Sequence, residues 1–113
     1  MQIEIFTKAL ADQTRLRLLS LLVDTPELCV CEFTQALALP QPKISRHLAI
    51  LREAEILQDR RDGLWIYYRL HENLPNWCKT ILQALREGSQ NHAIFQADNE
   101  RLANAKKLNQ NCK

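Results

Sequence analysis

The chain lacks the features on which most small enzymes depend. Only two of its 113 residues are glycine, too few for a glycine-rich loop that cradles phosphate groups. It also has no Cys-x-x-Cys motif and no evident pairing of a cysteine with a histidine, which thiol enzymes commonly use. These absences argue against an enzyme.

Long apolar segments are absent as well. No run approaches the ~18 residues that a membrane-spanning helix needs, and the N-terminus does not place basic residues before apolar ones. We therefore expect a soluble cytoplasmic protein. In that compartment the four cysteines are better explained as reduced thiols, metal ligands or redox sensors than as a disulfide framework.

A strong excess of positive charge is missing too. The formal net charge is +2, and residues 1–88 hold 11 Lys or Arg against 11 Asp or Glu. Bulk charge gives no support for nucleic-acid binding, so any DNA-binding surface must be local. A local basic cluster does exist, diluted by nearby acidic residues: Lys43, Arg46, Arg52, Arg60 and Arg61.

Composition and periodicity predict one mainly α-helical domain, since 46% hydrophobic and 25% charged residues are ordinary for a globular chain. Apolar spacing and capping residues predict helices over 3–10, from Asp12 to about 24, 31–38, 43–55 and from Pro75 to about 86, with Gly88 as the last stop. Extended runs at 57–61 and 64–70 flank Asp62-Gly63, a two-residue turn that predicts a β-hairpin. We expect a domain over residues 1–88 and a weakly helical or disordered tail over 89–113.

The order of these elements is that of a winged helix-turn-helix domain. A four-residue, proline-bounded turn joins the helix over 31–38 to the one that begins at Lys43, which would enter the major groove of DNA. Polar residues at the start of that helix would contact base edges or phosphates: Gln41, Lys43, Ser45, Arg46 and His47. At the hairpin tip, Arg60 and Arg61 would contact phosphates or the minor groove. The basic residues alone would fit an ordinary solvated helix face, but the hairpin that follows favours DNA binding.

Cys29 and Cys31 lie at the start of the first helix of this motif. One residue apart, they are poorly placed to bridge each other, whereas both could bind one metal ion. Thiolates favour As(III), Sb(III), Cd(II), Pb(II) or Zn(II), and the partial positive charge of a helix N-terminus should enlarge the thiolate fraction of Cys31. Two small buried hydrophobic residues would also explain the pair, but a metal bound here would pull on the helix-turn-helix.

The other two cysteines have different surroundings. Cys78 lies on the apolar stripe of the helix after Pro75, which favours a packed core or interface cysteine. Cys112 lies on the tail, where it either has no role or swings onto a metal that two other thiolates already hold.

Four segments carry a resemblance to a known family: LADQTRLRLL at 10–19, ELCVCE at 27–32, QPKISRHL at 41–48 and LREA at 51–54. From about residue 3 to residue 88 the chain resembles the ArsR/SmtB metalloregulators, specifically the arsenical-resistance operon repressors. The resemblance implies a homodimer, formed through the first and last helices, that represses transcription from palindromic double-stranded operator DNA. As(III) or Sb(III), acting as the inducer, would bind cysteine thiolates and release the DNA.

Within the resemblance, Cys29 and Cys31 correspond to two arsenic ligands, while the family commonly carries a third cysteine where this chain has Thr34. The third bond would come from a small cellular thiol or water, from Cys112, or from Cys78, in that order. Two alternatives stay open. One is a thiol redox or persulfide-responsive repressor in which Cys78 bonds to Cys29 or Cys31, and the other is a sensor of a divalent soft metal such as Cd, Pb or Zn.

Overall fold

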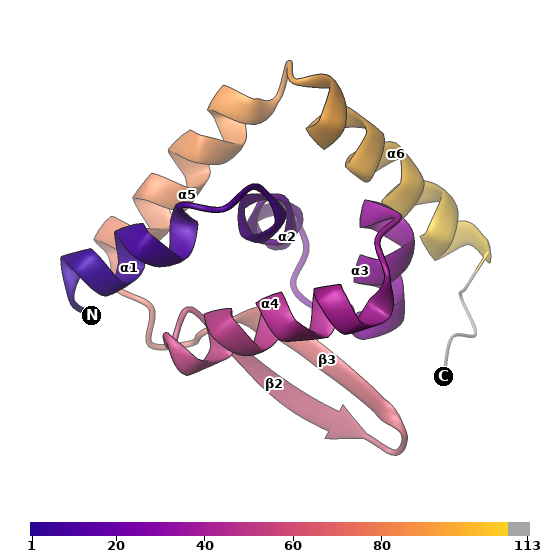
Figure 1. The fold of residues 1–113 in the computed structure, drawn as a ribbon, viewed down its shortest axis with the longest axis horizontal. Coiled ribbons are helices and arrows are strands. Elements are labelled where there is room, and N and C mark those ends of the chain that lie inside the picture. The colour runs from indigo at the N-terminus through magenta and orange to yellow at the C-terminus, as the bar shows by residue number, and fades with distance from the viewer. Residues whose placement is uncertain (109–113) are drawn as a thin grey trace.

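The computed structural model describes residues 1–108, with six helices and three strands in that part of the chain (Figure 1). The helices are α1 (Ile3–Leu10), α2 (Gln13–Asp24), α3 (Val30–Leu37), α4 (Gln41–Glu53), α5 (Asn76–Ser89) and α6 (Ala93–Leu108). The strands are β1 (Leu28–Cys29), β2 (Leu57–Asp62) and β3 (Trp65–Leu70). None of these helices combines the length and apolar character needed to cross a membrane.

Local signals in the sequence explain where the central helices begin and end. Asp12 caps α2, because its Oδ1 accepts a hydrogen bond of 3.0 Å from the backbone N–H of Arg15. Helix α3 ends at Leu37, and the C-cap residue after it, Ala38, takes the left-handed conformation at φ 53°. Three residues, 38–40, separate α3 from α4, one fewer than the four expected, because α4 already begins at Gln41 after Pro40.

The strands form an antiparallel sheet in the order β1-β3-β2. The predicted hairpin is present, but Asp62 pairs with Trp65, so Gly63 and Leu64 make the turn instead of Asp62 and Gly63. Gly63 has φ +63°, a left-handed conformation that glycine adopts more easily than residues with a Cβ atom. Strand β1 was not predicted; its two residues pair with Tyr67 and Tyr68 far along the chain.

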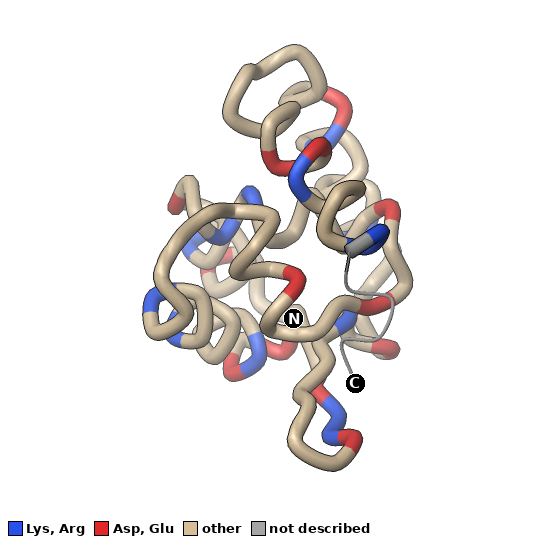
Figure 2. The backbone as a smooth tube through the Cα atoms, turned by 90° about the vertical axis from the view of Figure 1, so that its right-hand side faces the viewer, with Lys and Arg blue, Asp and Glu red and all other residues tan. Residues whose placement is uncertain are grey.

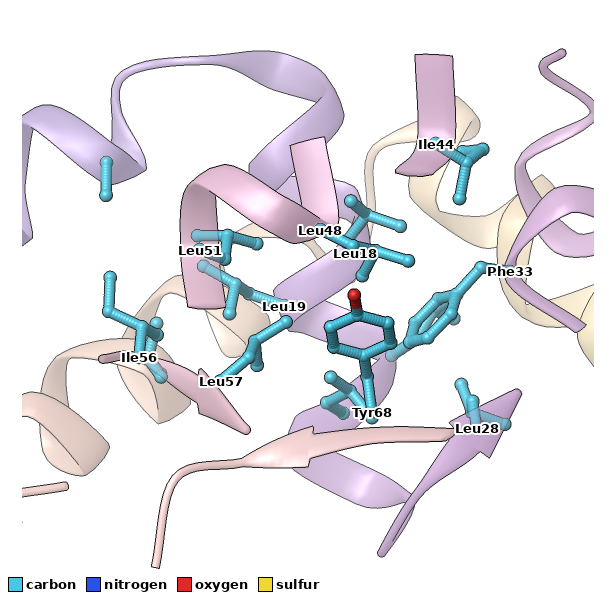
Figure 3. Close-up of a cluster of buried hydrophobic side chains, with 14 of the residues drawn as sticks. Leu18, Leu19, Leu28, Phe33, Ile44, Leu48, Leu51, Ile56, Leu57 and Tyr68 are labelled. Atoms are coloured by element: carbon cyan, nitrogen blue, oxygen red, sulfur yellow. The ribbon is translucent and has the colours of Figure 1, made fainter. Parts of the chain in front are cut away.

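The hydrophobic core joins the helix-turn-helix to the sheet. Figure 3 shows side chains from α2, α3, α4, β1 and the hairpin converging on one cluster. Its members are almost fully buried: Leu18, Leu19, Leu28, Phe33, Ile44, Leu48, Leu51, Ile56, Leu57 and Tyr68. The positions of α3 and α4 are therefore fixed by a shared core, and the predicted winged helix-turn-helix, mainly α with a β-hairpin wing, is confirmed.

The C-terminal part differs from the expectation in two respects. Gly88 does not stop α5, which continues to Ser89, where the side-chain hydroxyl donates a hydrogen bond of 3.0 Å to the carbonyl of Arg86. Residues 93–108, expected to be weakly helical or disordered, form the continuous helix α6, which packs beside α3 (Figure 1). The division of the chain at residue 88 stays a prediction.

Candidate metalloid site and nucleic-acid interface

The two cysteines singled out by the sequence lie where β1 meets α3. Cys29 is the last residue of β1 and the N-cap of α3, and Cys31 is in the first turn of the helix. The side chain of Cys29 is 2% exposed and Cys31 is half-buried. The expectation that they are poorly placed to bridge each other is wrong: their Cα atoms are 5.4 Å apart and the structure joins their sulfurs in a disulfide. The extended backbone at Cys29 and the helical turn that follows bring the two side chains together.

Glu32 organises the backbone around this pair. Its Oε1 accepts a hydrogen bond of 3.0 Å from the backbone N–H of Cys29, and its Oε2 lies 3.5 Å from Nζ of Lys106 on α6. The Thr34 hydroxyl donates to the carbonyl of Val30 at 2.9 Å, so it is engaged within α3. The spacing of Cys29 and Glu32 matches a helix capping box, a sequence signal that could have identified Glu32 in advance.

A complete three-ligand site is not formed by the residues that the structure describes. Within 1–108, no three His, Cys, Asp or Glu side chains are grouped so that they could hold a metal ion, and this includes Cys78. Cys78 is a free thiol on α5, fully buried in the core, where burial raises its pKa. Cys112 lies outside the described residues. The donors that are brought together are therefore Cys29 and Cys31.

The first turns of α4 present the expected polar face. Gln41, Lys43 and Arg46 are exposed, while Ser45 is partly buried and accepts a hydrogen bond of 3.1 Å from Nε2 of Gln41. Proline near the start of α4 leaves no backbone donor unsatisfied inside the helix. This face is thus available to a ligand that approaches along the N-terminal half of α4.

His47 lies elsewhere, because it points into the protein instead of toward this face. It is 6% exposed, its Nδ1 lies 3.3 Å from a guanidinium nitrogen of Arg15, and Asp12 is 3.9 Å away. An arginine nitrogen can only donate, so Nδ1 is the acceptor in this contact. Burial lowers the pKa of His47, with Arg46, Arg15 and Lys43 adding to the effect and Asp12 opposing it. His47 therefore ties α4 to the start of α2.

Arg60 and Arg61 are exposed and lie between Asp59 and Asp62 on β2. Figure 2 shows basic and acidic residues next to one another along the hairpin. Arg60 is bound within the chain, since its guanidinium donates hydrogen bonds to both carboxylate oxygens of Glu27 and lies over the ring of Tyr67 at 4.4 Å. Sequence reasoning missed Glu27, because the ion pair joins residues far apart in the chain and only the sheet brings them together.

Comparison with known proteins places this fold in a family. The family model described as "Bacterial regulatory protein, arsR family" matches residues 12–59, which include both cysteines, α3 and α4. The arsenic resistance transcriptional regulator ArsR1 of Pseudomonas putida is 57% identical over 83 residues, covering 74% of this chain and 65% of that protein. The chain spans 64–66% of the length of three curated relatives named for arsenic or arsenical resistance.

Solved structures agree with the sequence match. HlyU from Vibrio cholerae is 30% identical with a TM-score of 0.69, over 78% of this chain and 91% of that one. The AntR antimony-specific transcriptional repressor is 29% identical with a TM-score of 0.65, over 79% of this chain and 81% of that one. The family and the fold are those of DNA-binding transcriptional regulators. The chain therefore belongs to the ArsR family of bacterial regulatory proteins.

Proposed function

We propose that this protein is a repressor that releases its operator when As(III) or Sb(III) binds the reduced thiols of Cys29 and Cys31. One observation carries the proposal: both sulfurs meet at the N-terminus of α3, the first helix of the helix-turn-helix. Relatives named for arsenic resistance and a structural neighbour named for antimony support the choice of metalloid.

The structure offers a short mechanical route from this site to DNA. Helix α3 has only eight residues, and three residues connect its end to α4. Phe33 on α3 packs in the same fully buried cluster as Ile44 and Leu48 on α4. Because close-packed interiors transmit displacement instead of absorbing it, a shift at the N-terminus of α3 moves the exposed face of α4.

The chemistry at the two cysteines is a condensation. Arsenious acid, As(OH)₃, reacts with two thiols to form two As–S bonds, and the two thiol protons leave with two hydroxyl groups as two water molecules. The disulfide must first be reduced to two thiols by a cellular dithiol, which is oxidised in exchange. Soft thiolates suit this group, and a small thiol or the remaining hydroxyl would complete the third position, with Cys112 as the next candidate.

In the repressor state we propose that Gln41, Lys43, Ser45 and Arg46 of α4 enter the major groove while Arg60 and Arg61 address phosphates. The exposure of the basic residues among them supports this assignment. His47, which is buried against α2, would orient α4 without touching DNA.

We also propose that a homodimer places two such helices on successive major grooves. Large apolar side chains remain exposed on α1 and α5, which are the first and last of the helices predicted within residues 1–88 and expected to form the dimer: Ile3 at 63%, Ile5 at 45%, Trp77 at 39% and Leu85 at 41%. Phe6 and Trp77 already pack edge to face, so α1 and α5 offer one continuous surface. Since a bacterial regulator acts on the chromosome, the cytoplasm is the proposed location.

The test is fluorescence anisotropy of the reduced protein on its own upstream DNA, titrated with arsenite. A coupling of about 3 kcal/mol would weaken operator binding about 100-fold. We expect release in wild type and in Cys78→Ser, the matched control, but not in Cys29→Ser/Cys31→Ser. Continued binding of wild type under arsenite would contradict the proposal, and release by Cd(II), Pb(II) or Zn(II) alone would make the protein a divalent-metal sensor.

A second candidate function follows from the disulfide itself. A repressor switched by oxidants or persulfides would use Cys29 and Cys31 as the bonded pair, because the structure joins them and leaves Cys78 free. In the same assay, oxidant without metalloid would then release the DNA. If Cys78 took part, oxidation would also protect its thiol from alkylation, which is the pairing first expected from the sequence.

A further inference from the structure

Glu27 and Arg60 form an ion pair that connects the start of β1 to the wing. Nε of Arg60 donates to Oε2 of Glu27 at 3.0 Å, and a second guanidinium nitrogen donates to Oε1. The Arg60 side chain is 47% exposed and that of Glu27 is 30% exposed. The hydrogen bonds to Glu27 raise the pKa of Arg60, so its charge is present at every physiological pH. The guanidinium is thus held by a carboxylate of its own chain.

Arg60 shares a cross-strand row of the sheet with Cys29, two strands away. In the register of the strands Cys29 lies opposite Tyr67, and Tyr67 lies opposite Arg60. Arg60 also stacks on Tyr67, with its guanidinium carbon 4.4 Å from the ring centroid. Glu27 directly precedes β1, which is only two residues long and ends at Cys29. Any shift of Cys29 therefore moves the strand that positions Glu27.

A carboxylate and a phosphate bind a guanidinium in the same way. Each offers two oxygens to the planar fork of nitrogen donors, so the two compete for one arginine. An exposed ion pair is weak enough to be exchanged for a phosphate of DNA. The negative charge of Glu27 thus opposes the contact that Arg60 would make with an operator.

We propose that Glu27 competes with DNA phosphates for Arg60. This competition sets how strongly the wing binds the DNA backbone, and it responds to the state of Cys29 and Cys31. This inference rests on the operator-binding function proposed above. Operator binding transfers Arg60 from Glu27 to a phosphate. A ligand on Cys29 and Cys31 fixes β1 and Glu27 in the position that retains Arg60, so the wing contact is lost together with the shift of α4.

The test is a double-mutant cycle with Glu27→Gln, Arg60→Gln and the double variant, measured on operator DNA over a range of salt concentrations. Glu27→Gln is expected to raise affinity about 1.5- to 5-fold per protomer, the range of an exposed ion pair. It is also expected to steepen the plot of log affinity against log salt by up to about 0.9 per arginine. Both effects should vanish in the Arg60→Gln background.

Glu72→Gln is the matched control, because it removes the same charge from another exposed ion pair, 3.6 Å from Arg69. It should change neither quantity. An equal gain from Glu27→Gln with and without Arg60 would show a general charge effect and overturn the proposal. So would an unchanged salt slope in Glu27→Gln.

Failure of this proposal is distinguishable from failure of the repressor function. If wild type binds the operator and arsenite releases it, but the cycle shows no coupling, the competition is refuted and the repressor stands. If wild type does not bind the operator, a measurement without DNA still tests the ion pair. Exchange of the Arg60 Nε–H proton with water, followed by NMR, should be slower in wild type than in Glu27→Gln. Equal exchange rates would overturn the proposal even if no operator is bound.

Discussion

Asp98→Ala should destabilise the protein more than any change to a surface ion pair. Asp98 on α6 is 1% exposed and receives two hydrogen bonds, of 2.8 and 2.7 Å, from the guanidinium of Arg17 on α2, which is 6% exposed. Its Oδ1 also accepts a hydrogen bond of 3.0 Å from Arg101. Removing the carboxylate leaves the buried charge of Arg17 without a counter-ion.

Loss of one partner from a buried pair typically costs 3–5 kcal/mol. Arg17 retains a hydrogen bond of 2.9 Å to the carbonyl of Leu37, so the lower end, about 3 kcal/mol, is expected. Urea denaturation followed by circular dichroism measures this directly. With a slope of about 1–3 kcal/mol per molar, the midpoint should fall by about 1–3 M.

Asp24→Ala is the control, because Asp24 also pairs with an arginine of a distant helix. Nε of Arg86 lies 2.6 Å from its Oδ2, but the two side chains are 51% and 34% exposed. The expected cost is about 0–1 kcal/mol. A second variant, Arg17→Met/Asp98→Leu, removes both buried charges and should recover most of the lost stability. An Asp98→Ala protein within 1 kcal/mol of wild type, or one no less stable than Asp24→Ala, would refute the reasoning.

Two further predictions concern pH and backbone conformation. Because burial holds the pKa of His47 below its ordinary value of 6.5, the unfolded chain takes up the proton first. Wild type should therefore lose stability relative to His47→Gln as pH falls through 6.5 toward the folded pKa, and urea midpoints that differ by the same amount at every pH would contradict this. Gly63→Ala forces alanine to φ +63° and should lower the free energy of unfolding by about 1 kcal/mol. Gly88 lies inside α5 with open space around it, so Gly88→Ala should raise that free energy by about 0.5–1 kcal/mol. Melting temperatures that shift in the same direction in both variants would contradict this.

Local signals were sufficient for most of the fold. The capping carboxylate of Asp12, the proline before α4 and the apolar spacing at Ile44, Leu48 and Leu51 all act within a few residues, so they can be recognised without tertiary contacts. Strand β1 could not be predicted in this way, because a two-residue strand is defined only by its partners, Tyr67 and Tyr68.

Helix α6 was underestimated because little of it depends on an apolar face. Leu102 and Ala105 are buried there, but the contacts between Asp98 and Arg17 and between Arg101 and the carbonyl of Ala36 are polar and long-range. A hydrophobic pattern cannot reveal such contacts. The predicted end of α5 at Gly88 was wrong because glycine after an apolar stripe favours the end of a helix but does not require it.

The candidate site was also predictable where local sequence signals determine it. The type and spacing of Cys29 and Cys31 identified them, and the exposure of Lys43 and Arg46 followed from helical periodicity. The burial of His47 did not, because residue 47 lies at the edge of the apolar stripe and only the approach of α2 decides on which side it falls.

The contacts of α3 explain why a ligand at its N-terminus would act on α4 in particular. At the N-terminal end, Glu32 holds the backbone of Cys29 and lies 3.5 Å from Lys106. At the C-terminal end, two arginines bind the last carbonyls of the helix, Arg101 at Ala36 and Arg17 at Leu37, over 2.8 and 2.9 Å.

A displacement at the cysteines therefore acts on a helix that is anchored at both ends to its neighbours. Three residues connect α3 to α4, and α4 contacts α2 through its core face and His47. If α6 were released by Asp98→Ala, the same displacement could be absorbed by movement of α3 against α6. The variant should then bind the operator but lose part of its response to arsenite, an outcome that links the stability of α6 to the coupling between the two sites.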